Sequence, residues 1–260
     1  MNRLLLILVM ILTVYSFGFS QSEKEFFNQG VKAYNSKNFK GARENFTKAI
    51  EQSHTYIEAY YYRGISYRSM KEDSIAIYDF NKVIELSPEY AAAYYQRGIS
   101  YKNLLYDVKA ISDFTKAILI NYKFAEAYNS RGLVYFSLEK NQTAISDYNK
   151  AIKLNPKYSE AYYNRGLVYY KLEKHSNAIS DFSKAIKFNP KYAEAYYNRG
   201  NVYYDLKENQ LAISDFTKAI EINPKHADAY MYRGSILGGV TSQCKEGIED
   251  LDKAIQLNPK

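Results

Sequence analysis

The sequence predicts an all-α protein, an array of seven helical hairpins that each come from one copy of a 34-residue unit. Two observations on spacing and one on pattern predict this class. The heptapeptide EAYYNRG occurs at Glu160–Gly166 and again, 34 residues later, at Glu194–Gly200. An Arg-Gly pair recurs at the same step from Arg63 to Arg233. Within each unit the apolar residues recur every three or four positions, which is typical of helices that bury one face.

The repeat accounts for nearly the whole chain. A Lys-Ala-Ile or Lys-Val-Ile column follows the same step of 34, except for one inserted residue before Lys253. We therefore assign residues 21–260 to the array and expect each unit to pack mainly on its neighbours. The predicted units are residues 23–56, 57–90, 91–124, 125–158, 159–192, 193–226 and 227–260.

The sixth unit shows why each unit should form two helices. Tyr196, Gly200 and Tyr203 recur at steps of four and three, which predicts one face of a first helix. The polar run KENQ follows, and a second apolar stripe around Phe216 predicts a second helix that ends before Pro224. Because glycine in a helix is less favourable than alanine by about 1 kcal/mol, Gly200 indicates the close approach of a neighbouring helix.

An arginine and an aspartate recur together in these units. In the first unit both are replaced, by Gln29 and Asn45. This joint change favours a hydrogen-bonded or ionic pair inside each hairpin over a phosphate- or carboxylate-binding site, since arginine suits carboxylate pairing. The aspartates that follow their arginines by 16 residues are Asp79, Asp113, Asp147, Asp181 and Asp215, and Asp250 follows by 17.

The N-terminal residues differ from the array. One charge, Arg3, precedes the apolar stretch Leu4–Tyr15, and small residues follow at Gly18 and Ser20. This layout is typical of a secretory signal peptide over residues 1–20, cleaved after Ser20. We therefore predict an exported protein of the periplasm, cell envelope or secreted space, with no membrane insertion after cleavage. Retention of the segment as an N-terminal anchor is the alternative.

Catalytic and metal sites are not predicted. The histidines His54, His175 and His226 lie at unrelated repeat positions and form no ligand cluster. The sequence contains no glycine-rich phosphate loop or nucleophile motif. We therefore predict no catalytic residue, no metal, no cofactor and no enzymatic activity. Cys244, the only cysteine, cannot form an internal disulfide and is expected to have no role.

The repeated columns closely resemble the tetratricopeptide repeat. That family has an aromatic residue, Gly and Tyr in its first helix, then Ala, an aromatic residue and Ala before Pro. The resemblance covers residues 23–260 and implies a right-handed α-solenoid of seven helix-turn-helix units, with first helices lining a concave groove. Departures lie mostly at the ends, such as Phe26 for Tyr in the first unit and Leu237 for Tyr in the last. In the second unit the matching residues are Tyr60, Gly64, Tyr67, Ala76, Phe80 and Pro88.

Aromatic and amide residues remain on the first helices once these packing columns are removed. Some tetratricopeptide arrays bind extended peptides through an asparagine ladder, so the resemblance implies a peptide-binding groove, with rigid rings adding contact area. An ordinary helix surface without a ligand is the alternative. The candidate groove residues are Asn28, Tyr34, Tyr61, Tyr95, Gln96, Phe136, Tyr163, Asn164, Tyr170, Tyr197, Asn198 and Tyr204.

The charge distribution argues against nucleic acid. The formal net charge is +7, but on the expected groove the acidic residues outnumber the basic ones. Nucleic-acid binders concentrate basic residues on one face. The acidic residues are Glu58, Glu126, Glu160, Glu194, Asp205 and Asp228, and the basic ones are Lys24, Arg68, Lys102 and Lys171.

The function predicted from the sequence is therefore a non-catalytic scaffold or adaptor that binds a protein or peptide partner. The alternatives are a helical repeat that binds nucleic acid and a structural spacer without a groove ligand. The groove positions carry mostly Tyr and Glu, which disfavours the family's two-carboxylate clamp. No capping helix follows Lys260, so self-association through the last unit is a further prediction.

Overall fold

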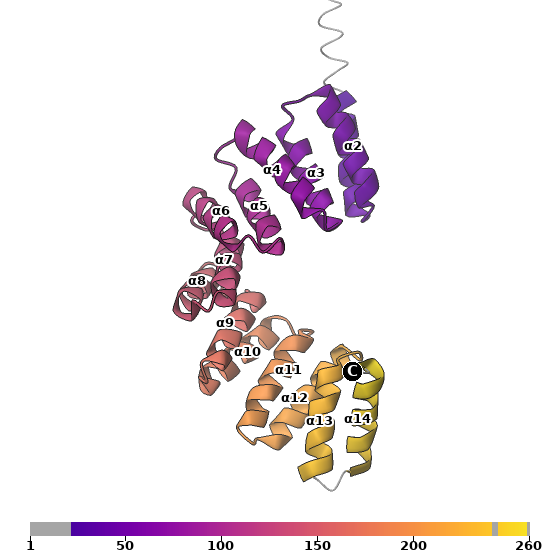
Figure 1. Ribbon diagram of the computed structural model, residues 1–260, viewed down its shortest axis with the longest axis vertical. Helices are drawn as coiled ribbons and strands as arrows, with labels where there is room; N and C mark the ends of the chain where they lie inside the picture. The colour runs from indigo at the N-terminus through magenta and orange to yellow at the C-terminus, as the bar shows by residue number, and fades with distance from the viewer. Residues whose placement is uncertain (1–21, 241–243, 259–260) are drawn as a thin grey trace, which may run out of the picture. The chain divides into compact units, whose positions relative to one another are not determined.

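The computed structural model describes residues 22–240 and 244–258. In this part of the chain the regular structure is helical and contains no strand, which confirms the predicted all-α fold (Figure 1). None of the helices described is both long enough and apolar enough to cross a membrane. The predicted signal peptide, residues 1–20, lies outside the described residues.

The helices follow one another in short hairpins, and in hairpins that lie within one compact unit of the chain the two helices pack side by side. A helix over residues 22–35 comes first. It is followed by α2 (Phe39–Gln52), α3 (Ile57–Ser69), α4 (Asp73–Leu86), α5 (Ala91–Asn103), α6 (Asp107–Ile120), α7 (Ala125–Ser137) and α8 (Asn141–Leu154). The remaining helices are α9 (Ser159–Lys171), α10 (His175–Phe188), α11 (Ala193–Asp205), α12 (Asn209–Ile222), α13 (Ala227–Val240) and α14 (Cys244–Leu257).

The chain divides into two compact units, Met1–Val134 and Tyr135–Lys260. The described part of the first unit holds the helix at 22–35, α2 to α6 and most of α7. The second holds the end of α7 and the helices from α8 to α14. We refer to these two bodies as the N-terminal unit and the C-terminal unit, and to the 34-residue segments as repeats.

In each of the first six hairpins, one residue in a left-handed conformation makes the turn between the two helices. In the fifth repeat this is Glu173, with φ of 56°, and the amide of Lys174 donates to the carbonyl of Tyr169 over 2.9 Å. Such a bond from beyond the helix end back to its last turn satisfies a free carbonyl and ends the helix. The other left-handed residues are Lys37, Lys71, Leu105, Glu139 and Lys207.

After the third to sixth repeats, the turn that leads into the next repeat is made by an asparagine, whereas the first two repeats have serine there. The side-chain oxygen of Asn155 accepts a hydrogen bond from the amide of Lys157 over 3.2 Å, and Asn189 does the same for Lys191. Pro156, between Asn155 and Lys157, lacks an amide hydrogen and cannot continue the helix. These local bonds explain why the Asn-Pro-Lys sequence marks the end of a repeat.

The core follows the glycine and phenylalanine columns. Phe182 is fully buried on α10, and a methyl group added at Gly166 on α9 would lie 2.8 Å from its ring. Gly200 and Phe216 are related in the same way in the next repeat. The glycine therefore lets the second helix bring its ring against the backbone of the first, which is the close approach predicted from Gly200.

Tyr148 is the exception in this column. Phenylalanine occupies the equivalent position in the neighbouring repeats, for example at Phe114 and Phe182. Tyr148 is as deeply buried as they are, and its hydroxyl has no hydrogen-bond partner among the described residues. Burial, with a smaller effect of Asp147, raises the pKa of the Tyr148 hydroxyl.

We expect Tyr148→Phe to stabilise the protein by about 1 kcal/mol or more, because a buried hydroxyl without a partner costs about 1–3 kcal/mol. Urea unfolding followed by circular dichroism measures the change. The reverse substitution in the next repeat, Phe182→Tyr, is the matched control and should be destabilising. A loss of stability in Tyr148→Phe would show that the hydroxyl is satisfied in solution.

Candidate functional site

The arginine column is held inside the hairpins by the aspartates. The Nε and Nη2 atoms of Arg165 donate to the two carboxylate oxygens of Asp181, each over 2.7 Å. This planar, two-point geometry is the one for which arginine is suited. The predicted pairing is therefore present here, and the same bidentate contact joins Arg63 to Asp79, Arg97 to Asp113, Arg199 to Asp215 and Arg233 to Asp250.

Each of these arginines also reaches the preceding repeat. The Nη1 atom of Arg199 donates to the hydroxyl of Ser183 over 2.8 Å, and that of Arg165 donates to Asn149. The guanidinium of Arg165 further lies over the rings of Tyr162 and Tyr169. One arginine thus joins the two helices of its own hairpin and the second helix of the hairpin before it. The N–H groups of its guanidinium are therefore used in contacts within the fold.

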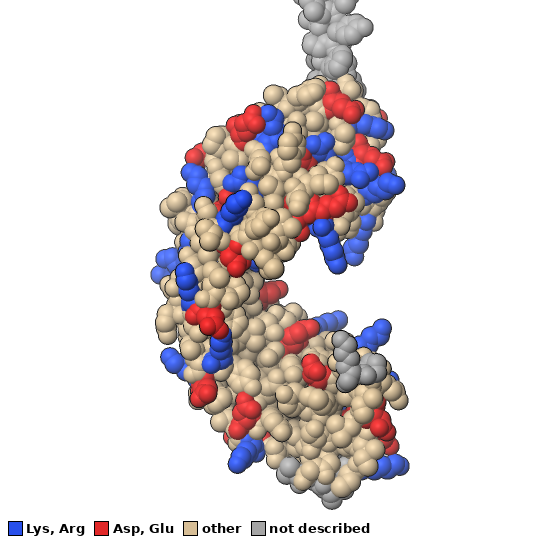
Figure 2. Space-filling view, viewed as in Figure 1, with Lys and Arg blue, Asp and Glu red and all other residues tan. Residues whose placement is uncertain are grey.

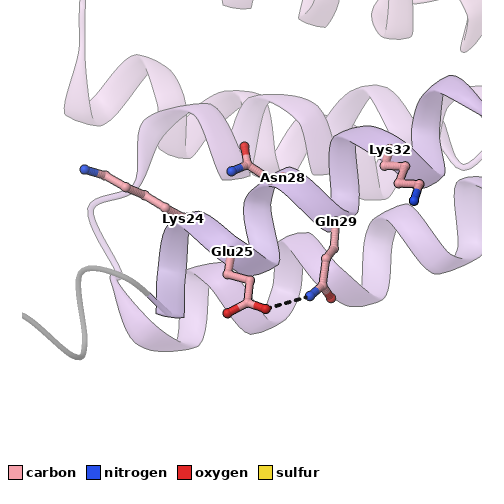
Figure 3. A pocket seen from close by; sticks show the side chains of 5 residues that line it. All are labelled: Lys24, Glu25, Asn28, Gln29 and Lys32. Atoms are coloured by element: carbon pink, nitrogen blue, oxygen red, sulfur yellow. Dashed lines mark hydrogen bonds between the residues drawn. The ribbon is translucent and has the colours of Figure 1, made fainter.

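The first repeat replaces this pair with local bonds. Gln29 donates to Glu25 on the same helix over 3.4 Å, and Asn45 donates to the carbonyl of Gly41 over 2.9 Å. Figure 3 shows Gln29 and Glu25 with Asn28 along the helix at 22–35, where they border a shallow cleft of about 510 Å³. Asn28, a candidate groove residue, is exposed there. The outer face of this first helix is polar.

The candidate groove tyrosines of one column are partly buried and also pack between hairpins. Tyr163 packs between Phe182 of its own hairpin and Tyr192, with ring centroids 5.9 and 4.7 Å away. The column members Tyr61, Tyr95 and Tyr197 are wedged in the same way. These rings fill the junction between hairpins because the residue before each first helix is also a ring, at Tyr90, Phe124, Tyr192 and His226.

The amide column bonds to the tyrosines of the preceding repeat. Asn198 donates to the hydroxyl of Tyr163 over 3.1 Å, and Gln96 makes a longer contact of 3.5 Å with Tyr61. Burial and the nearby Glu194 raise the pKa of Tyr163 to about 12, although the bond from Asn198 opposes this shift. Asn164 is buried. These amides are therefore partly engaged within the fold.

The second aromatic column lies nearer the surface. Tyr204 is 39% exposed and contacts the ring of Tyr232. Tyr170 is partly buried, and its hydroxyl donates to Asp205 over 2.7 Å. Phe136 lies under the ammonium group of Lys171, and Tyr34 packs against Phe39. Of the candidate aromatic residues, Tyr204 offers the most free surface to a ligand.

Acidic residues border the tyrosines of the C-terminal unit. Glu160, Glu194 and Asp228 stand at the same position of successive repeats and are exposed. Their charges raise the pKa of neighbouring tyrosines, with burial the larger cause, as for Tyr192 and Tyr197. Over the face shown in Figure 2, basic and acidic side chains are interspersed on both units. The sequence analysis counted these acidic residues in the charge of the expected groove, but it did not include them among the candidate groove residues.

The last hairpin keeps an apolar surface. Met231, Leu251 and Ile255 border a shallow cleft of about 320 Å³ on α13 and α14, and Ile255 is exposed. In the preceding hairpin the corresponding Ala219 and Ile220 are buried. Self-association through this surface stays a prediction. The described residues contain no group of His, Cys, Asp and Glu that could hold a metal ion.

Family models match several segments of the chain. Two described as tetratricopeptide repeats match residues 193–226 and 58–90. A third, described as a TPR repeat, matches residues 132–173 and 168–207. Among curated proteins, none matches the chain.

Solved structures give the same result. The chain is 30% identical in sequence to MamA in its crystal structure. The match covers 64% of this chain and 96% of MamA, with a TM-score of 0.56. The chain is 29% identical to YrrB, described as a TPR protein with an unusual peptide-binding site, covering 72% and 97% with a TM-score of 0.56. A tetratricopeptide repeat protein from Parabacteroides merdae, 20% identical, covers 92% and 94% with a TM-score of 0.70 and shows the fold.

Proposed function

Because the chain belongs to the tetratricopeptide repeat family, we propose that it is a non-catalytic scaffold that binds a peptide segment of another protein. The peptide lies along the first helices, on the side that carries Tyr204 and Asn198. Proteins of this family are generally scaffolds without catalytic activity, and YrrB, at 29% identity, is described as having a peptide-binding site.

Two side-chain hydrogen bonds between the first helices of successive repeats in the C-terminal unit carry the proposal. The bonds from Asn198 to Tyr163 and from Tyr170 to Asp205 each join residues 35 apart. They hold first-helix side chains of successive repeats in fixed positions, so that a ligand meets a preorganised surface. Tyr204 adds an exposed ring beside them. An extended peptide suits such a repeating row of aromatic and polar groups.

We place this scaffold outside the cytoplasm, in the cell envelope or the secreted space. The support for this part of the proposal is the layout of Arg3, Leu4–Tyr15, Gly18 and Ser20. Export also disfavours nucleic acid as the ligand.

A photo-reactive residue placed at position 204 in living cells tests the proposal. We expect it to crosslink one main protein through a segment without regular structure, in the exported fraction, on chains that begin at Gln21. The same probe at Ser180, which is exposed on the second helix α10, should not capture that protein. Equal capture from both positions, or capture of RNA or DNA alone, would contradict the proposed binding side or ligand.

A peptide of the crosslinked segment then gives the energetic test. Tyr204→Ala together with Asn198→Ala should weaken its binding about tenfold or more, because a few anchors dominate most interfaces. The control variant Ser180→Ala with Lys187→Ala changes two exposed residues of α10 and should bind as the original chain does. Unchanged binding by the first variant would place the site elsewhere.

A further inference from the structure

The third repeat carries an exposed apolar surface on its second helix. Leu105 and Val108 are each 82% exposed, and Leu119 is 74% exposed. Tyr106 and Tyr122, at the two ends of the same helix, are also exposed. Single exposed apolar side chains are ordinary, but a group of five within one repeat marks an interaction surface. We call these five residues the α6 surface.

The other repeats show that the α6 surface is not required by the fold. At the position of Val108 they carry Lys40, Ser74, Gln142, Ser176 and Gln210. At the position of Leu119 they carry Glu51, Glu85, Lys153, Lys187 and Glu221. These hairpins form the same helices with polar or charged residues there. The apolar residues of the third repeat therefore serve something outside the hairpin.

The α6 surface runs along one side of the helix. Val108 and Leu119 are 11 residues apart, which is close to three helical turns, so they lie in one line about 16 Å apart. Ser112, between them, is exposed as well. Leu105 and Tyr106 occupy the turn that leads into α6, and Leu105 has the left-handed conformation of that turn. The result is a narrow row of projecting side chains.

Exposed apolar side chains also occur on the second helix of the preceding hairpin, α4. Arg97 on α5 bonds both Asn81 on α4 and Asp113 on α6, each over 2.7 Å. Tyr78, one turn before Asn81, is 68% exposed, and Ile75 beside it is exposed too. Two successive second helices of the N-terminal unit thus expose apolar side chains, and the larger group is the α6 surface.

Basic residues flank the row. Lys109 lies 5.3 Å from the ring of Tyr106, and Lys123 lies 5.6 Å from the ring of Tyr122. Lys116 is on the same helix. The acidic residues of this repeat are Asp107 and Asp113, and Asp113 is engaged by Arg97. The free charge around the α6 surface is thus mainly positive.

We propose that the α6 surface docks on an anionic lipid bilayer. Projecting aliphatic side chains can enter the soft boundary between head groups and acyl chains, tyrosines suit its polar side, and lysines attract anionic lipids. A second copy of the chain is a poor occupant, because a two-fold contact through this helix would bring Lys109 and Lys116 of one copy close to the same lysines of the other. Docking of this kind is peripheral and needs no spanning helix.

A polarity-sensitive fluorophore reports the contact locally. The full chain carries Cys244→Ser, since Cys244 is a free, exposed thiol, and Val108→Cys for labelling. With vesicles of phosphatidylcholine and phosphatidylglycerol we expect a blue shift of the probe, and little shift with phosphatidylcholine alone. Replacing Lys109 and Lys116 by glutamine should weaken vesicle binding about 30-fold, from about 1 kcal/mol per lysine.

The matched control is the same label on Lys40→Cys, the equivalent position of the first repeat. Position 40 is nearer in the chain to the apolar stretch Leu4–Tyr15, so anchoring through that stretch would affect this probe at least as much. Equal shifts at 40 and 108, or no shift at 108, would overturn the proposal. A cysteine at position 108 that is shielded from labelling in cells, while its probe shows no shift on vesicles, would also overturn the proposal and would favour an acidic protein partner.

Discussion

Replacing Arg165 by alanine is expected to lower the free energy of unfolding by about 3–5 kcal/mol, the usual effect of removing one partner of a buried ion pair. The carboxylate of Asp181 is almost fully buried and would lose both of its bonds to the guanidinium. The contact with Asn149 of the preceding repeat would be lost as well. Urea unfolding followed by circular dichroism measures the change. If the two units unfold in separate transitions, the free energy of unfolding is determined for each transition.

A double-mutant cycle with Asp181→Ala isolates the interaction. The second substitution should add much less in the Arg165→Ala chain than it does alone, because the partner is already missing. The pair Lys218–Glu221 is the control: its atoms lie 2.6 Å apart, but both side chains are more than half exposed. Breaking it should change stability by less than about 1 kcal/mol. Plain additivity at Arg165 and Asp181 would show that their contact does not stabilise the fold.

Phe182→Ala is expected to have an effect of similar size, about 3–5 kcal/mol, because it removes a fully buried ring from the core of the fifth hairpin. The ring of Phe182 is fully buried, lies against Gly166 and supports Tyr163. Its removal leaves a cavity between the two helices of the hairpin and at the junction with the sixth repeat. The same unfolding measurement applies.

Ile248→Ala in the last hairpin is the control for Phe182→Ala. Ile248 is a large apolar residue that is 59% exposed, and such a surface change usually stays within about 0.5 kcal/mol. A Phe182→Ala chain as stable as this control would mean that α9 and α10 close over the cavity, and that Gly166 does not set the distance between them.

The helices and the internal bonds of the hairpins could be predicted from the sequence. The spacing of 16 residues between Arg165 and Asp181 spans one hairpin, and the joint change at Gln29 and Asn45 indicated that the two residues are partners. Gly200 indicated a close approach because glycine has no other reason to stand inside a helix. These features depend on contacts at a constant separation along the chain, and a repeat displays such a separation many times.

The surfaces could be predicted only in part. A repeat shows that Tyr163 and Tyr197 occupy equivalent positions, but it does not show whether a ring faces a ligand or the next hairpin. Both rings are wedged between hairpins, against the aromatic residues that end each repeat. Tyr204, which the sequence placed in the same candidate site, stays exposed. Tyr204 therefore offers a ligand more surface than Tyr163 or Tyr197 does, and the peptide-binding role of the candidate residues stays a prediction.

The amino-acid sequence by itself determined the helical class, the 34-residue period, the hairpin and its internal ion pair, because each follows from residues at fixed short separations. The tertiary structure decided which aromatic rings are buried and that the chain forms two compact units. It also decided that Val108 and Leu119 are left in solvent. Burial depends on which helix faces cover one another, and that is settled by packing across the repeats rather than by the identity of any single residue.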